Sequence, residues 1–219
     1  ANGYYTQEDD IEDHLLDLGH SVTRMKDYKL KGTTSLAAYD LVVISEFAPS
    51  IPTSGINNLE AAGVPILIVE YWDFSYSQKL GLTTSSSCGY VGTDTVTSIR
   101  EGYDDFTSRV GAEALVYQPS YTVYGIDIAS VKSNATPLYS SSASFEEVAV
   151  LVDYTKKIAA TGVYDTRKYT VDAWKMFDIL LAQILPAVGR YSSVAEIAQA
   201  YYESGLYSFA DEVEAELKR

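Results

Sequence analysis

Glu70 stands at the end of an apolar run and is the position in this sequence best placed for chemistry. Residues 64–69 read Val-Pro-Ile-Leu-Ile-Val, a continuous apolar stretch typical of a strand that is buried on both faces. Asp73 follows Glu70 closely, and two neighbouring carboxyl groups can act as general acid and general base when their surroundings separate their pKa values. The alternative is structural: Glu70 accepts hydrogen bonds from backbone amides or pairs with a basic side chain.

Aromatic side chains follow the same strand end: Tyr71, Trp72, Phe74 and Tyr76. Such a cluster can stack on a carbohydrate or contact another protein, or it can form an apolar lid over the edge of a sheet. Ser45 closes a second buried apolar run. We expect Ser45 to face the same crevice, because ligands of open α/β sheets bind at the carboxyl ends of the strands.

The elements that must position these residues alternate between strand and helix. Periodic apolar residues predict helices over 6–18, 54–62 and 170–185, buried strands over 40–45, 64–69 and 147–154, and a further strand over 158–163. This alternation predicts an α/β fold with a mostly parallel sheet and helices on both faces. A short strand is predicted over 21–25, and strands over 89–99, 114–117 and 121–128 predict antiparallel additions at the edge of the sheet.

The last part of the chain has a different pattern. Pro186 ends the predicted helix over 170–185, and two further helices are predicted over 194–204 and 208–218. We therefore expect an α/β domain over residues 1–185 and a helical appendage over residues 186–219.

Composition excludes several classes of function. The chain of 219 residues has a formal net charge of −14, so neither nucleic acid nor an anionic membrane surface is an expected partner. One cysteine and two histidines are too few for a cysteine or histidine metal site, and no nucleotide-binding glycine motif occurs. We therefore expect no metal and no cofactor. No apolar run reaches about 18 residues, so no membrane-spanning helix is expected.

Other features of the composition indicate a secreted or cell-surface protein. The chain holds 19 tyrosines and two runs of consecutive serines, at 85–87 and 140–142. Asn134-Ala135-Thr136 is a sequon for N-glycosylation, although Pro137 follows it. We therefore predict an extracellular or cell-surface location and regard Asn134 as a candidate glycosylation site.

Three segments carry a family resemblance. They read Leu-Gly-His-Ser-Val-Thr at 18–23, Tyr-Asp-Leu-Val-Val-Ile-Ser at 39–45 and Gly-Val-Pro-Ile-Leu-Ile-Val-Glu at 63–70. In this order they resemble the class I glutamine amidotransferase-like family, and residues 163–178 look like the closing helix of that group. The resemblance spans residues 5–185 and implies a three-layer, flavodoxin-like sheet. The chain is most similar to non-catalytic members, which occur as modules of large secreted or surface proteins.

Two departures from the family pattern bear on activity. In catalytic members the strand that matches residues 64–69 ends in a Cys within a glycine-flanked elbow, whereas Glu70 stands here between bulky neighbours. The family's catalytic His lies late in the chain, but this sequence has no His after His20, and Cys88 lies well beyond the elbow. The resemblance therefore implies that the Cys–His chemistry of glutaminases is absent.

A third departure concerns the start of the fold. The family opens with a central strand before the first helix, but residues 1–5, Ala-Asn-Gly-Tyr-Tyr, are too short and turn-like for a buried strand. A sheet without this strand would leave backbone groups unpaired. We expect the strand to come from a longer polypeptide upstream or from another chain, which would make strand donation a means of self-association.

These observations give three hypotheses about function. The leading one is a non-enzymatic structural or interaction module of a secreted or surface assembly, with a protein as its partner. The second is a carbohydrate-directed hydrolase that uses Glu70 and Asp73. The third is a glycan- or small-ligand-binding domain that uses Tyr71, Trp72 and Tyr76.

Overall fold

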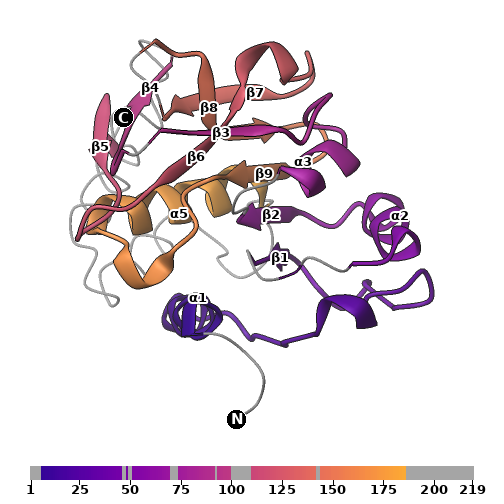
Figure 1. Cartoon of the computed structure of the whole chain (residues 1–219). Coiled ribbons are helices and arrows are strands. Elements are labelled where there is room, and N and C mark those ends of the chain that lie inside the picture. Colours follow the sequence, from indigo (N-terminus) through magenta and orange to yellow (C-terminus); the bar gives the residue numbers. More distant parts are fainter. Residues whose placement is uncertain are drawn as a thin grey trace, which may run out of the picture. The chain divides into compact units, whose positions relative to one another are not determined.

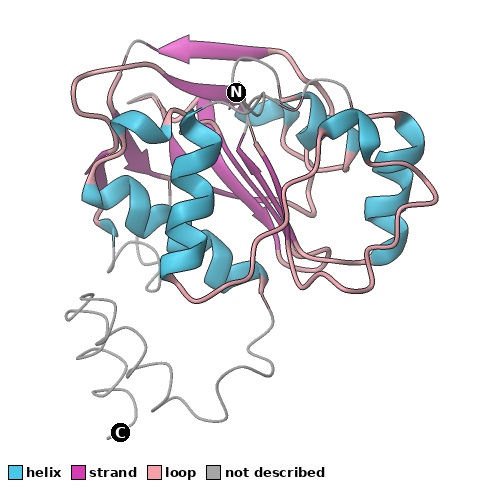
Figure 2. Ribbon diagram, turned by 90° about the horizontal axis from the view of Figure 1, so that it is seen from below, coloured by secondary structure: helices cyan, strands magenta, loops and turns pink. Residues whose placement is uncertain are grey.

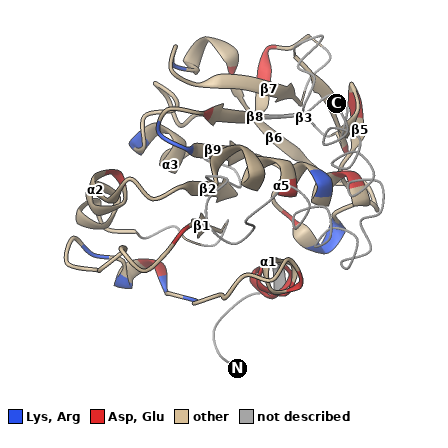
Figure 3. Cartoon of the chain, turned by 180° about the vertical axis from the view of Figure 1, so that it is seen from behind, with Lys and Arg blue, Asp and Glu red and all other residues tan. Residues whose placement is uncertain are grey.

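A computed structural model describes residues 6–45, 48, 51–69, 74–91, 93–99, 110–141 and 144–185. The chain divides into two compact units, Ala1–Arg24 with Pro186–Arg219, and Met25–Leu185. In the first unit, helix α1 (Thr6–Asp17) carries acidic side chains along its length (Figure 3), and Arg24 pairs with Asp9 and Glu12 of this helix. The predicted helices over 194–204 and 208–218 lie outside the described residues.

The second unit contains the described sheet and every described helix except α1 (Figure 1). Its elements are η1 (Asp27–Lys29), β1 (Val42–Ile44), α2 (Thr53–Ala62), β2 (Ile66–Val69), α3 (Ser75–Lys79), β3 (Cys88–Val91), β4 (Thr95–Ser98), β5 (Glu113–Leu115), β6 (Val123–Asp127), η2 (Ile128–Ser130), β7 (Thr136–Ser140), β8 (Glu147–Asp153), β9 (Ile158–Thr161), η3 (Thr166–Lys168) and α5 (Val171–Ile184).

The described strands form one open sheet in the order β1-β2-β9-β8-β7-β4-β5, with β6 pairing with both β3 and β8. The pairs β1–β2 and β2–β9 are parallel, and the remaining pairs are antiparallel. The predicted α/β, flavodoxin-like fold class is confirmed. The antiparallel part is larger than the predicted edge additions, because a short turn joins β8 to β9 and such a turn can only connect antiparallel strands.

Strand β2 lies between two layers of helix, and Figure 2 shows helices on both sides of the strands. Ile66 and Ile68 belong to the same hydrophobic core cluster as Ile56 and Leu59 of α2. Since side chains alternate along a strand, the other residues of β2 face the opposite side, where α5 packs. All four residues of β2 are buried, as the continuous apolar run predicted.

The helices predicted over 6–18, 54–62 and 170–185 and the four strands are confirmed within a few residues, but only Ile44 of β1 is buried. The strand predicted over 21–25 is wrong: these residues have no ladder partner among the described strands, and Arg24 turns to α1 instead. The strand predicted over 89–99 is two strands, β3 and β4, which pair with different neighbours. Sequence reasoning missed β7, because Pro137 and a break in its register with β8 weaken the strand pattern.

The chain just beyond the end of β9 contacts β6. The N–H of Tyr124 donates to the carbonyl oxygen of Gly162 at 3.2 Å. A Cβ on Gly162 would lie 2.0 Å from the carbonyl oxygen of Tyr124, so this approach requires glycine. This contact brings Tyr124 of β6 beside the carboxyl end of β9.

Candidate functional site at the carboxyl end of the parallel strands

The carboxyl ends of the three parallel strands meet at one edge of the sheet, where Val69 of β2 pairs with Thr161 of β9. Ser45 directly follows β1 and is half-buried at this edge, where the sequence predicted it. The predicted residues that follow β2 lie outside the described part of the chain: Glu70, Tyr71, Trp72 and Asp73. Their proposed roles stay predictions, and the described chemistry of this edge belongs mainly to β9.

Tyr76 is engaged in the fold. Its side chain is 5% exposed, and its hydroxyl donates to the carbonyl oxygen of Ala48 and accepts from the N–H of Ile51 at 3.2 Å. Lys79 Nζ lies 4.9 Å from the centre of its ring. Tyr76 therefore ties the loop after β1 to α3, and its ring is not a surface on which a sugar can stack.

Five tyrosines gather beyond the end of β9, and we call them the tyrosine cluster: Tyr117, Tyr121, Tyr124, Tyr164 and Tyr169. The ring of Tyr164 lies 5.6 Å from Tyr124, 5.8 Å from Tyr121 and 6.4 Å from Tyr117, measured between ring centres. Trp174 of α5 extends the cluster through an edge contact with Tyr169 at 4.9 Å. These spacings are those at which aromatic rings attract one another.

The hydroxyl groups of the tyrosine cluster bond to the chain around them. The hydroxyl of Tyr117 accepts from the backbone N–H of Tyr164 at 2.7 Å and from that of Asp165 at 3.3 Å. The hydroxyl of Tyr169 donates to the carbonyl oxygen of Val163. Burial, together with the hydrogen bond to Tyr121, raises the pKa of Tyr164. At neutral pH Tyr164 is therefore protonated, and the hydroxyls of Tyr117 and Tyr169 hold the backbone after β9 in place.

Asp165 supplies the buried charge of this edge. Its side chain is fully buried, and Arg167 binds both of its oxygens, with Nε 2.7 Å from Oδ1 and Nη2 2.8 Å from Oδ2. Lys168 Nζ lies 3.9 Å from Oδ2 and 3.2 Å from the centre of the Tyr121 ring. This two-point arginine bond neutralises the carboxylate and fixes its orientation.

Together these contacts determine what the described part of this edge can do chemically. A general base needs a carboxylate with a free oxygen, and a tyrosine nucleophile needs a lowered pKa. Here both oxygens of Asp165 are bonded to a guanidinium, and the pKa of Tyr164 is raised. The arrangement is suited to rigid packing around a buried ion pair.

A second carboxyl group lies in the antiparallel part. Glu147, at the start of β8, packs against Gly89 and Gly125, which pair with each other across β3 and β6. A Cβ on Gly89 would lie 2.5 Å from Glu147 Oε1, so the carboxyl group fills the space that the glycine leaves. Burial, with the nearby charge of Asp127, raises the pKa of Glu147.

The described residues contain no group of three or more metal-ligating side chains that could hold an ion. Cys88, in β3, is half-buried. In the same described ranges, no helix combines the length and the apolar character needed to cross a membrane.

Sequence reasoning missed the site beyond β9. The signal was a density of tyrosines around a short charged segment, Tyr-Asp-Thr-Arg-Lys-Tyr at 164–169, with Tyr121 and Tyr124 some forty positions earlier. The pattern of charge in 165–168 predicts a solvated turn, because an aspartate is buried only where its partner is supplied. Only the fold shows that Asp165 is buried, with the hydroxyl of Tyr117 bonded to its backbone N–H.

Comparisons with known proteins bear on the fold. No family model and no curated protein matches the sequence. Among solved structures, a Thermoplasma acidophilum protein described as one of the subunits of GMP synthase is similar, with 15% identity and a TM-score of 0.52, over 83% of this chain and 89% of that one. The glutaminase domain of Trypanosoma brucei CTPS matches with 10% identity and a TM-score of 0.42, over 83% and 90%. The first likeness supports the class I amidotransferase fold, and at this identity it carries no activity with it.

Proposed function

We propose that this protein is a non-enzymatic structural or interaction module, with an amidotransferase-like fold, of a secreted or surface assembly. The observation that carries the proposal is the engagement of the polar groups beyond β9. Asp165 is bound at both oxygens by Arg167, and Tyr117 and Tyr169 are bonded to the backbone. Polar groups that are already bonded to one another at the carboxyl ends of the strands favour a structural role over a catalytic one. The sequence supports the same view, since it has no histidine after His20.

The proposed partner is a further copy of this chain, joined through strand β1. Among the described strands β1 ends the sheet and pairs only with β2. The N–H of Val42 donates to Pro65 at 2.9 Å, so by alternation the N–H and carbonyl of Val43 point away from β2. An outward edge of this kind can accept an added strand.

The absence of catalysis is tested with the purified chain and with its Glu70→Gln variant. Both are assayed for release of ammonia from glutamine and for hydrolysis of aryl glycosides, and we expect neither to turn over any substrate. Hydrolysis by the wild type that Glu70→Gln abolishes would overturn the proposal and establish Glu70 as a catalytic residue.

Self-association is tested by sedimentation velocity over a range of concentrations. Val43→Pro removes the outward N–H of β1 without removing a bond to β2, and proline is tolerated on the open side of an edge strand. Val43→Thr is the matched control, because it keeps the N–H. We expect association in the wild type and the control and its loss in Val43→Pro. A monomeric wild type, or equal association in all three, would contradict strand pairing at β1.

A further inference from the structure

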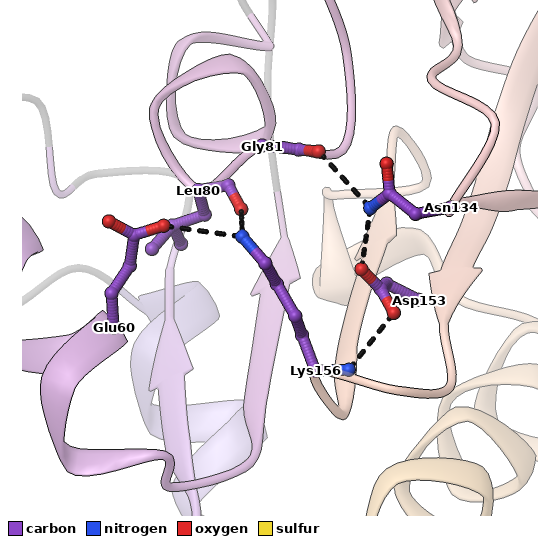
Figure 4. A network of polar contacts seen from close by, with 6 residues as sticks. All are labelled: Glu60, Leu80, Gly81, Asn134, Asp153 and Lys156. Atoms are coloured by element: carbon purple, nitrogen blue, oxygen red, sulfur yellow. Dashed lines mark hydrogen bonds and ion pairs between the residues drawn. The ribbon is translucent and has the colours of Figure 1, made fainter.

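The sequon residue Asn134 lies at the other end of the parallel strands, beside the turn that joins β8 to β9 (Figure 4). Its side-chain Nδ2 donates to Asp153 Oδ2 at 2.6 Å and to the carbonyl oxygen of Gly81 at 3.3 Å. Both hydrogens of the amide nitrogen are therefore directed at acceptors in two other segments of the chain.

Asp153 depends on this contact. Its side chain is 1% exposed, and its Oδ1 accepts from the backbone N–H groups of Thr155 and Lys156, both at 2.9 Å. Oδ2 faces Asn134. The buried carboxylate is thus stabilised by backbone N–H groups and one amide, and losing a donor to a buried charged group is costly.

The other two residues of the sequon are also fixed by contacts within the fold. The N–H of Ala135 donates to the carbonyl oxygen of Lys132 at 2.9 Å, and Ala135 is 7% exposed. Thr136 begins β7 and pairs with Val152 of β8. A glycan on Asn134 would replace one of the two hydrogens on Nδ2, so the modified side chain could satisfy only one of its two acceptors.

We propose that Asn134 is a structural donor to Asp153, and that glycan attachment at Asn134 and the folded state oppose each other. The sequon is then a by-product of a turn whose geometry requires an amide. In the folded protein Asn134 carries no glycan. The exposure of Asn134 at the surface, which favours modification by itself, is overridden by the position of its nitrogen between Asp153 and Gly81.

The first test isolates the amide in protein made without glycosylation. Asn134→Ala is compared with Ser133→Ala, an exposed neighbour in the same turn. We expect Asn134→Ala to lower the Tm by roughly 3–10 °C, since a lost hydrogen bond to a buried charge has this effect in a chain of this size. Ser133→Ala should match the wild type. An unchanged Tm in Asn134→Ala would overturn the proposal.

The second test concerns the glycan itself. Because Pro137 by itself hinders glycosylation, the chain is secreted from a eukaryotic host as Pro137→Val, and Thr136→Ala in the same background removes the sequon but keeps the amide. Peptide mass spectrometry is combined with thermal unfolding of the separated forms. We expect Asn134 to be unmodified in the stable form, and any glycosylated form to melt lower than the Thr136→Ala control. A glycosylated form as stable as that control would contradict the proposal.

Discussion

Two aspartates at opposite ends of the parallel strands are buried to the same degree and stabilised in different ways. Asp165, beyond the carboxyl end of β9, is fully buried and held by the guanidinium of Arg167. Asp153, before the amino end of β9, is 1% exposed and held by two backbone N–H groups and the amide of Asn134. One carboxylate is balanced by a full opposite charge, and the other by dipoles.

The difference shows how each end of the sheet is built. A turn can offer its own N–H groups to a carboxylate, so Asp153 is stabilised mainly by residues next to it in sequence. The segment after β9 is covered by tyrosine rings from distant parts of the chain, and a charge placed under them needs a counter-charge. Burying an aspartate at the carboxyl ends of the parallel strands therefore costs more free energy than burying one at the other end.

The largest expected effect comes from removing the counter-charge. Arg167→Ala leaves Asp165 buried beside Lys168 alone, and we expect a loss of about 3 kcal/mol in the free energy of unfolding. This is the lower end for a broken buried pair, because the Arg167 side chain is 49% exposed. Urea unfolding measures it. Lys175→Ala, which breaks the partly exposed pair with Asp172, is the control and should lose less than about 1 kcal/mol. Equal losses would mean that Asp165 is not stabilised by charge.

The dipole-stabilised end is tested by adding a charge. Asn134→Asp replaces a donor by a second carboxylate next to Asp153, and we expect a loss of about 2 kcal/mol at neutral pH. Two carboxyl groups at this distance share a proton, so the pKa of one of them rises above the ordinary value of about 3.9. The lost stability should therefore return as the pH falls through that raised pKa. Unfolding curves between neutral and mildly acidic pH measure this, and a loss independent of pH would contradict it.

Removing a single hydroxyl group from the tyrosine cluster should lower the stability of the fold. Tyr117→Phe removes the hydroxyl that accepts from the N–H groups of Tyr164 and Asp165, and we expect a loss of about 1–2 kcal/mol. Tyr28→Phe, at a tyrosine that is 53% exposed, is the control and should be neutral. If Tyr117→Phe is also neutral in urea unfolding, the hydroxyl does not hold the turn after β9.

Alkaline pH should reduce the stability that Tyr164 contributes at the carboxyl ends of the parallel strands. Because the pKa of Tyr164 is raised in the folded protein, the folded state keeps a proton that the unfolded state releases above about pH 10. Stability is then fully present below that pH and falls above it, by at most about 1.4 kcal/mol per pH unit for this group. Tyr164→Phe should flatten the fall in thermal unfolding, whereas Asn134→Ala should leave its slope unchanged.

The smallest expected effect lies at the rim of the Asp153 turn. Lys156 Nζ lies 3.3 Å from Glu60 Oε1 and donates to the carbonyl oxygen of Leu80 at 3.1 Å (Figure 4). Both charged side chains are more than two-fifths exposed, so Glu60→Gln should lose only about 0.5 kcal/mol, and less in high salt. If Glu60→Gln lost as much stability as Asn134→Asp, the Lys156–Glu60 ion pair would be a main source of stability at the Asp153 turn.

Sequence patterns predicted the parts of the fold that depend on local periodicity. The run at 64–69 became β2, and the apolar stripe over 170–185 became α5, because burial on both faces or on one stripe leaves a direct trace in the order of residues. The patterns failed where the pairing between strands determines the structure. Residues 89–99 read as one strand but pair in two places, and Pro137 concealed β7.

The candidate site divides in the same way. Sequence placed Ser45 and Glu70 after buried strands, since the end of an apolar run can be read directly. It left Tyr76 open between a contact surface and an apolar lid, and the fold buries the ring and uses its hydroxyl to tie the loop after β1. An aromatic side chain has the same identity in a core and at a surface, so only its surroundings distinguish the two.

By itself, the sequence determined the α/β class, the strand that ends before Glu70 and the absence of any histidine after His20, because these depend on composition and short periodicity. Only the tertiary structure decided which polar groups are engaged. Asp165 donates its backbone N–H to the hydroxyl of Tyr117, far away in the sequence, and Asn134 meets Asp153 and Gly81 across separate turns. Whether such a group is a reactive site or a structural support depends on the distance and burial of partners that lie far away in sequence.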